Sequence, residues 1–123
     1  MTTAVARILV AEDEPSVSAF VQRALTHAGH TVTGVPDGLA AVAALAAQPF
    51  DLLLSDIMMP GLDGIALALK AGRDYPAMKI LLMSGYASEI QRAHNLDALA
   101  HRVIAKPFTL AEICDAVAAT LAS

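Results

Sequence analysis

The 123-residue sequence is poor in several residue types, and these shortages exclude some kinds of structure. It has no Trp, two Tyr and three Phe, so its core must be built mainly from aliphatic side chains. Its single cysteine, Cys114, cannot form an internal disulfide, which excludes a disulfide-stabilised scaffold. Because Cys114 falls at helical spacing with Leu110, Val117 and Leu121, we expect a small core residue and not a reactive thiol.

Charge is also sparse, since charged residues make up 16% of the chain and the net charge is -4. The eight Lys and Arg residues are scattered, so we expect no nucleic-acid partner. No apolar run approaches the roughly 18 residues of a membrane span, and nothing resembling a signal peptide precedes the first predicted strand. With 56% apolar residues, the chain is expected to be one compact domain. The single cysteine and the lack of a signal peptide predict the cytoplasm, and we expect a monomer with no membrane partner.

Five short apolar runs alternate with stretches of helical pattern, which is typical of βαβ units. The predicted strands are residues 8–11, 31–35, 52–55, 80–84 and 102–105. The first, third and fourth runs are nearly continuous aliphatic stretches, as in strands covered on both faces by helices. The sequence thus predicts the α/β class, with a doubly wound five-stranded parallel sheet flanked by helices.

Capping signals place the helices. Pro15 suits the first position of a helix that stops at Gly29. Further helices are predicted from about residue 37 to before 49, from 64 to about 72, and from just after 107 almost to the end. Thr109 and Glu112 have capping-box spacing at the start of the last one. The alanine enrichment of residues 40–47 is ordinary helix propensity.

Polar residues follow the predicted strands where their carboxyl ends meet, which is where open parallel sheets bind ligands. They are Glu12, Asp13 and Glu14 after the first strand, Asp56 after the third, Ser84 after the fourth and Lys106 after the fifth. Crowded carboxylates raise one another's pKa, so such a cluster usually holds a cation. Oxygen ligands without His or Cys suit Mg²⁺ better than zinc. The histidines form no ligand spacing and are expected at the surface: His27, His30, His94 and His101.

The order of these residues resembles the receiver domains of response regulators, which have the chemotaxis-regulator fold. The strongest segments are 55–61, Ser-Asp-Ile-Met-Met-Pro-Gly, and 106–108, Lys-Pro-Phe. The resemblance covers about residues 6–121. It implies the strand order 2-1-3-4-5 and a single receiver domain over residues 1–123, with no output domain.

Carried over to this sequence, the resemblance implies a Mg²⁺ site and a phosphoacceptor. Asp56 would accept the phosphoryl group and also bind the metal. Asp13 would bind the metal directly, Glu12 mainly through water, and the backbone carbonyl of Met58 would complete the protein ligands.

The same resemblance assigns two side chains to the phosphoryl group. Ser84 would donate a hydrogen bond to one phosphoryl oxygen, and Lys106 would pair with another. The peptide bond between Lys106 and Pro107 is expected to be cis.

These roles imply a phosphoacceptor response regulator of a two-component or phosphorelay system, which switches protein–protein interactions. The donor would be the phosphohistidine of a sensor histidine kinase or of a histidine phosphotransfer protein, and a downstream protein target is a further candidate partner. Beyond self-dephosphorylation no enzymatic activity is expected. A relay shuttle and a docking regulator both remain open.

The sequence departs from the common receiver pattern at the switch positions. Val103 stands where an aromatic switch residue is usual, three residues before Lys106, whereas Tyr86 supplies an aromatic two residues after Ser84. The string from 83 to 87 resembles a receiver subgroup whose fourth helix tends to be irregular. Apolar residues over 85–101 make no single helical stripe, so we expect a mobile segment there in place of a fixed fourth helix.

Two alternatives have different sequence signatures. A Mg²⁺-dependent hydrolase of small phosphate esters, of the haloacid-dehalogenase type, usually places a second Asp two residues after the nucleophile, and here that position is Met58. A receiver that no longer accepts phosphate would lack some of the functional groups, and all of them are present here.

Overall fold

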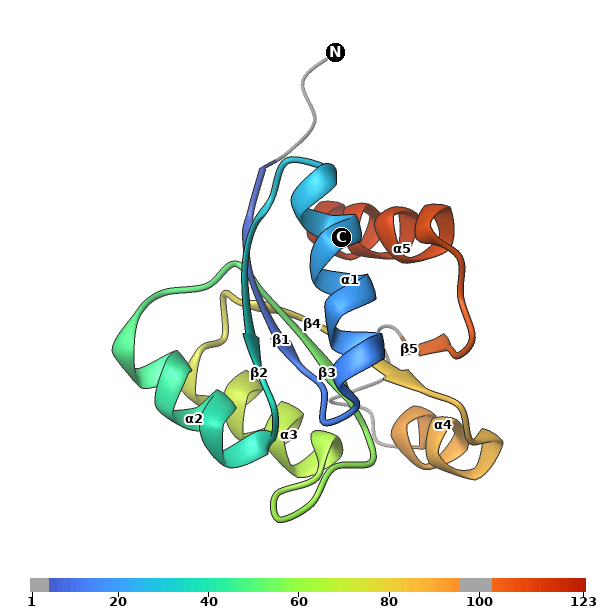
Figure 1. Ribbon diagram of the computed structural model, residues 1–123. Helices are drawn as coiled ribbons and strands as arrows, with labels where there is room; N and C mark the ends of the chain where they lie inside the picture. The colour runs from blue at the N-terminus through green and yellow to red at the C-terminus, as the bar shows by residue number, and fades with distance from the viewer. Residues whose placement is uncertain (1–4, 96–102) are drawn as a thin grey trace.

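The structure is a computed structural model, and it describes residues 5–95 and 103–123. Strands and helices alternate along the chain (Figure 1). The strands are β1 (Arg7–Ala11), β2 (Thr31–Val35), β3 (Leu52–Asp56), β4 (Lys79–Ser84) and β5 (Val103–Ala105). The helices are α1 (Pro15–His27), α2 (Gly38–Ala47), α3 (Gly64–Asp74), α4 (Ala87–His94) and α5 (Leu110–Ala122).

All five strands are parallel and lie in the order β2-β1-β3-β4-β5. This confirms the predicted fold class and strand order. Helices α1 and α5 cover one face of the sheet, and α2, α3 and α4 cover the other (Figure 1). In the described part of the chain, no helix is long and apolar enough to cross a bilayer.

Alternation along the strands distributes aliphatic side chains to both faces. In β1, Ile8 and Val10 pack against the α1 and α5 side, whereas Leu9 packs on the α2 and α3 side. All three are fully buried. A strand that is apolar at consecutive positions therefore has a core on each face, as the continuous runs predict.

Most of the predicted helix ends are confirmed. Pro15 is the first residue of α1, and Gly29 follows it with a φ of 102°. Thr109 and Glu112 form the predicted capping box of α5. Helix α3 continues to Asp74, two residues beyond the predicted end at Gly72. A single glycine such as Gly72 is tolerated within a helix.

The fourth helix corrects one prediction. Residues 87–94 form α4, although the sequence predicts no fixed helix over 85–101. A short helix can be held by a few apolar side chains that face the core. In α4, Ile90 is half-buried and Ala93 is fully buried. Whether α4 opens on phosphorylation stays a prediction, and residues 96–101 of the predicted segment lie outside the described residues.

One histidine corrects another prediction. His30 is buried, since the turn after α1 brings it against the start of β1, where its Nδ1 accepts a hydrogen bond from the Ala6 N–H at 3.0 Å. His27 and His94 are exposed as predicted, and His101 lies outside the described residues. Cys114 is half-buried and packs against the α1 and α5 core, as expected of a structural residue.

Candidate functional site

A pocket of about 610 Å³ lies at the carboxyl edge of the sheet. The segments that follow β1, β3, β4 and β5 all contribute to its wall. Its lining residues are Glu12, Asp13, Glu14, Val17, Asp56, Met58, Gly85, Tyr86, Lys106 and Pro107. The structure thus brings together the predicted carboxylates and the predicted lysine from three separate parts of the chain.

Three carboxylates form the centre of this pocket. One oxygen each from Glu12, Asp13 and Asp56 lies within 4.8 Å of the other two. Glu12 is 2% exposed and Asp56 is 7% exposed, whereas Asp13 faces solvent. Burial raises the pKa of both Glu12 and Asp56, because removal from water disfavours a carboxylate.

Lys106 is the cation that compensates these two buried acids. Its Nζ lies 2.6 Å from Glu12 Oε1 and 3.3 Å from Asp56 Oδ2. Burial by itself lowers the pKa of Lys106, but the hydrogen bond to Glu12 and the charge of Asp56 outweigh burial and raise it. The ammonium is therefore held in its charged form directly beside the candidate phosphoacceptor.

Backbone hydrogen bonds direct Glu12 into the pocket. Its N–H donates to the Val35 carbonyl at 3.1 Å, which extends the β1–β2 pairing by one residue. Its Oε2 accepts the Glu14 N–H at 3.1 Å. Both Glu12 carboxylate oxygens are thus engaged, one by the lysine and one by the backbone.

Gly64 holds the backbone of Asp56, a role that sequence reasoning missed. Its N–H donates to the Ile57 carbonyl at 2.8 Å, so the start of α3 rests on the end of β3. A Cβ atom at this position would lie 2.0 Å from the Asp56 carbonyl oxygen. The sequence marks Gly64 as a helix start, but the close approach to β3 is a tertiary contact that no local pattern encodes.

Ser84 does not line the pocket in this structure. It is 1% exposed, and its Oγ accepts a hydrogen bond from the Tyr86 N–H at 3.0 Å. Tyr86, by contrast, lines the pocket with 57% of its surface exposed, and it is also the N-cap residue of α4. The Ser84 O–H is directed at the Tyr86 carbonyl at 3.5 Å, so the predicted hydrogen bond to a phosphoryl group requires the hydroxyl to turn its proton away from that carbonyl.

The remaining predicted residues lie at the margin of the site. Met58 lines the pocket with an exposed side chain. Val103 is half-buried and packs against the small core of Ile57, Leu82 and Ala93. An aliphatic side chain therefore occupies the position at which the resemblance leads one to expect a mobile aromatic ring. The bond between Lys106 and Pro107 is cis, as predicted.

The donor set fits Mg²⁺. Every candidate ligand is an oxygen, and no His or Cys occurs among the residues that line this pocket. Asp13 faces solvent and can offer its carboxylate to a hydrated cation, whereas Glu12 is already bound at both oxygens.

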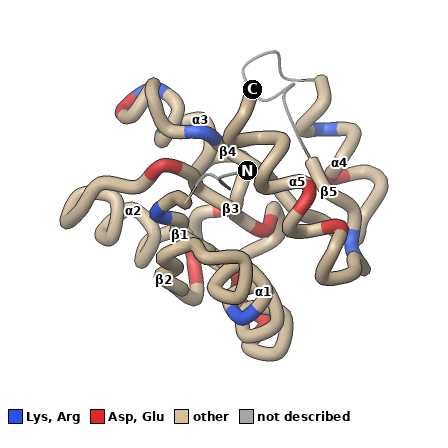
Figure 2. The backbone as a smooth tube through the Cα atoms, turned by 90° about the horizontal axis from the view of Figure 1, so that it is seen from above, with Lys and Arg blue, Asp and Glu red and all other residues tan. Residues whose placement is uncertain are grey.

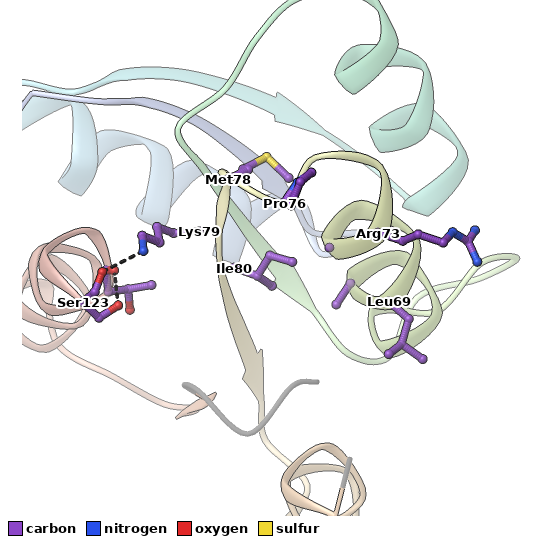
Figure 3. A pocket seen from close by; sticks show the side chains of 10 residues that line it. Leu69, Arg73, Pro76, Met78, Lys79, Ile80 and Ser123 are labelled. Carbon is purple, nitrogen blue, oxygen red and sulfur yellow. Dashed lines mark hydrogen bonds between the residues drawn. The ribbon is translucent and has the colours of Figure 1, made fainter. Parts of the chain in front are cut away.

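A second hollow, of about 480 Å³, lies beside α3 and the start of β4 (Figure 3). Its apolar lining includes Leu69, Met78 and Ile80. Lys79 and Ser123 also line it, and the Lys79 Nζ donates to the Ser123 carbonyl at 2.7 Å. None of the predicted site residues lines this hollow.

A 2-1-3-4-5 parallel sheet that carries an acidic cluster and a paired lysine at its carboxyl edge defines a receiver-type signalling domain. In agreement, the family model described as "Response regulator receiver domain" matches residues 8–118. This chain belongs to that family and is a receiver domain of the kind found in response regulators of two-component systems.

Relatives and solved structures agree with this assignment. The response regulator receiver protein CpdR of Brucella abortus is 40% identical over 114 residues, which cover 90% of this chain and 92% of CpdR. The transcriptional regulatory protein TcrA of Mycobacterium tuberculosis is 39% identical over 107 residues, but the match spans only 42% of TcrA. A CheY-like receiver domain protein from Methanospirillum hungatei superposes with a TM-score of 0.88 at 27% identity, covering 97% of this chain and 95% of that one.

Proposed function

We propose that Asp56 accepts a phosphoryl group from the phosphohistidine of a sensor histidine kinase or a histidine phosphotransfer protein. One observation carries this assignment: the Asp56 carboxylate lies at the pocket with the Lys106 ammonium 3.3 Å from its Oδ2 and two further carboxylates close by. Phosphoryl transfer depends chiefly on positioning and on neutralising charge, so this small set of groups can suffice.

The transfer is a displacement at phosphorus. A carboxylate oxygen of Asp56 attacks, the new O–P bond forms as the P–N bond breaks, and the imidazole leaves with the electron pair of that bond. Lys106 is placed to pair with a phosphoryl oxygen as charge moves onto the acceptor. Because its Nζ donates to Glu12 Oε1 at 2.6 Å, the ammonium is positioned before the donor arrives.

We assign the metal ligands to Asp13, Asp56 and the backbone carbonyl of Met58, with Glu12 acting through water. When bound, Mg²⁺ would offset the negative charge that the phosphoryl group adds to an already acidic pocket. The buried carboxylates support this assignment, because the single ammonium of Lys106 pairs with both Glu12 and Asp56 and cannot neutralise both charges.

The switch follows from the position of Ser84. Its hydroxyl donates to the Tyr86 carbonyl at 3.5 Å, so donation to a phosphoryl oxygen would take that hydrogen bond away from the Tyr86 carbonyl. Tyr86 is the N-cap of α4, and its carbonyl accepts the N–H groups of Glu89 and Ile90. Phosphorylation at Asp56 would thus act on the first turn of α4 and on the exposed Tyr86 ring, which a partner can read.

The assignment is tested by intact mass measurement after treatment with phosphoramidate and Mg²⁺. Wild type should gain one phosphoryl group, and Asp56→Asn should gain none, because an amide is not an anionic nucleophile. Asp115→Asn, an exposed position on α5, is the matched control and should behave like wild type. Undiminished labelling of Asp56→Asn would overturn the assignment, and repeated turnover of p-nitrophenyl phosphate would favour the hydrolase alternative.

A further inference from the structure

Helix α2 is unusual for a helix on the surface of a domain. Its ten residues, Gly38–Ala47, include no polar or charged side chain. Its inner face, Gly38, Ala41 and Leu45, is buried, and Ala41 and Leu45 belong to the core on this face of the sheet. A surface helix normally carries polar side chains on its opposite face, and this one does not.

The outward face of α2 consists of Leu39, Ala43, Ala46 and Ala47, all exposed. We call these four residues the α2 face. Leu39 is the most prominent of them, with 67% of its surface exposed. The helix lies on the outside of the domain (Figure 1), and its tube carries neither charge colour (Figure 2). Apolar patches of this kind often mark an interaction surface.

We propose that the α2 face binds a second copy of this chain, with the two α2 helices antiparallel about a two-fold axis. A two-fold interface must be self-complementary. If the two Ala43 residues face each other on the axis, each Leu39 lies opposite Ala47 of the other copy, so the large side chain meets the small one. The proposal differs from the monomer predicted from sequence, and it does not depend on the proposed phosphorylation.

The charges at the two ends of α2 favour the antiparallel arrangement. Asp37 caps the N-terminal end, where its side chain accepts the Ala40 N–H at 2.8 Å. At the C-terminal end, the Arg7 guanidinium donates to Gln48 Oε1 at 3.1 Å. Antiparallel pairing brings the Asp37 end of one copy to the Arg7 end of the other, and it also opposes the helix dipoles. Since each copy carries a net charge of -4, a face without acidic residues is where two copies repel each other least.

The size of the α2 face sets the strength of this contact. A helix of this length is about 15 Å long, so the contact is smaller than a standard stable interface. We therefore expect a weak, reversible dimer, whose population rises with protein concentration.

Sedimentation velocity from about 10 μM to about 1 mM, on the unphosphorylated full chain, tests the dimer in the concentration range of weak complexes. Wild type should show a rising mean sedimentation coefficient, and Ala43→Glu should stay monomeric because it places two carboxylates on the axis. Ala119→Glu, an exposed alanine on α5, is the matched control and should follow wild type. A wild type that stays monomeric throughout would overturn the proposal, as would a dimer that Ala43→Glu leaves intact.

Cross-linking tests the orientation, and it uses a Cys114→Ser background. A mixture of Leu39→Cys and Ala47→Cys chains should form the mixed disulfide faster than either chain forms its own. Ala43→Cys alone should form a disulfide dimer faster than Ala119→Cys. Preferred self-pairing of Leu39→Cys and of Ala47→Cys would indicate parallel helices and would contradict the antiparallel model of the contact.

Discussion

Replacing Lys106 by methionine tests the electrostatics of the pocket most strongly. The substitution keeps an unbranched stem but removes the ammonium that lies 2.6 Å from Glu12 and 3.3 Å from Asp56. Two almost fully buried carboxylates then lose their compensating charge. Breaking a buried ion pair costs about 3–5 kcal/mol, and the partly open pocket lowers this to about 2 kcal/mol at neutral pH.

The stability lost in Lys106→Met should increase as the pH rises. Because burial raises the pKa of Glu12 and of Asp56, the folded chain holds protons that the unfolded chain has already released. These two groups therefore lower the free energy of unfolding as the pH rises from the ordinary carboxyl range toward their raised pKa values. Without Lys106 both pKa values rise further, so the decline should be steeper and should extend to higher pH.

Urea unfolding at several pH values between about 4.5 and 8, without Mg²⁺, measures this effect. Lys106→Met should match wild type most closely at the acid end and fall progressively below it toward neutral pH. Added Mg²⁺ should recover part of the loss, since a cation again offsets the carboxylates. Lys70→Met, which removes an exposed pair with Asp74, is the control and should change little. Equal stability of Lys106→Met and wild type at neutral pH would refute this account of the pocket.

Other positions give further predictions. Asp13→Ala should weaken Mg²⁺ binding at least tenfold in an NMR titration, and an unchanged Kd would move the metal elsewhere. Gly64→Ala should cost about 3 kcal/mol in urea unfolding and slow phosphorylation of Asp56, because the new Cβ would meet the Asp56 carbonyl, whereas Gly72→Ala should fold normally. Burial lowers the pKa of His30 in the folded chain. The neutral His30 therefore contributes to the free energy of unfolding above the ordinary histidine pKa, and this contribution is lost as the pH falls below that value. His30→Gln should flatten that part of the profile, and an unchanged slope would argue against this role.

The fold and the main site residues could be predicted because their signals are local or follow from the topology. Five apolar runs separated by helical stretches indicate a parallel sheet, and the residues that end those runs must meet at one edge. The sequence therefore predicts one shared site for Glu12, Asp13, Asp56 and Lys106. This holds although 94 positions separate Glu12 from Lys106. The Lys-Pro-Phe string supported the assignment independently.

The features that sequence reasoning missed depend on tertiary contacts. His30 looks like an ordinary turn residue until the start of β1 packs beside it and supplies the Ala6 N–H. The Ser84 hydroxyl has two possible partners, and only the structure shows that it engages Tyr86 in this state. The alanines of α2 indicate helix propensity alone, since their exposure depends on where the helix lies.

The central claim is that Asp56 is the residue that becomes phosphorylated, and its most direct test is to locate the modification in the wild-type chain. Borohydride reduces an aspartyl phosphate to homoserine, which marks the position permanently. After reaction with phosphoramidate and Mg²⁺, reduction and proteolysis, tandem mass spectrometry should find homoserine at position 56 and unmodified aspartate at 13 and 51. Homoserine at another position, or none at 56 in a chain that has gained phosphate, would contradict the account.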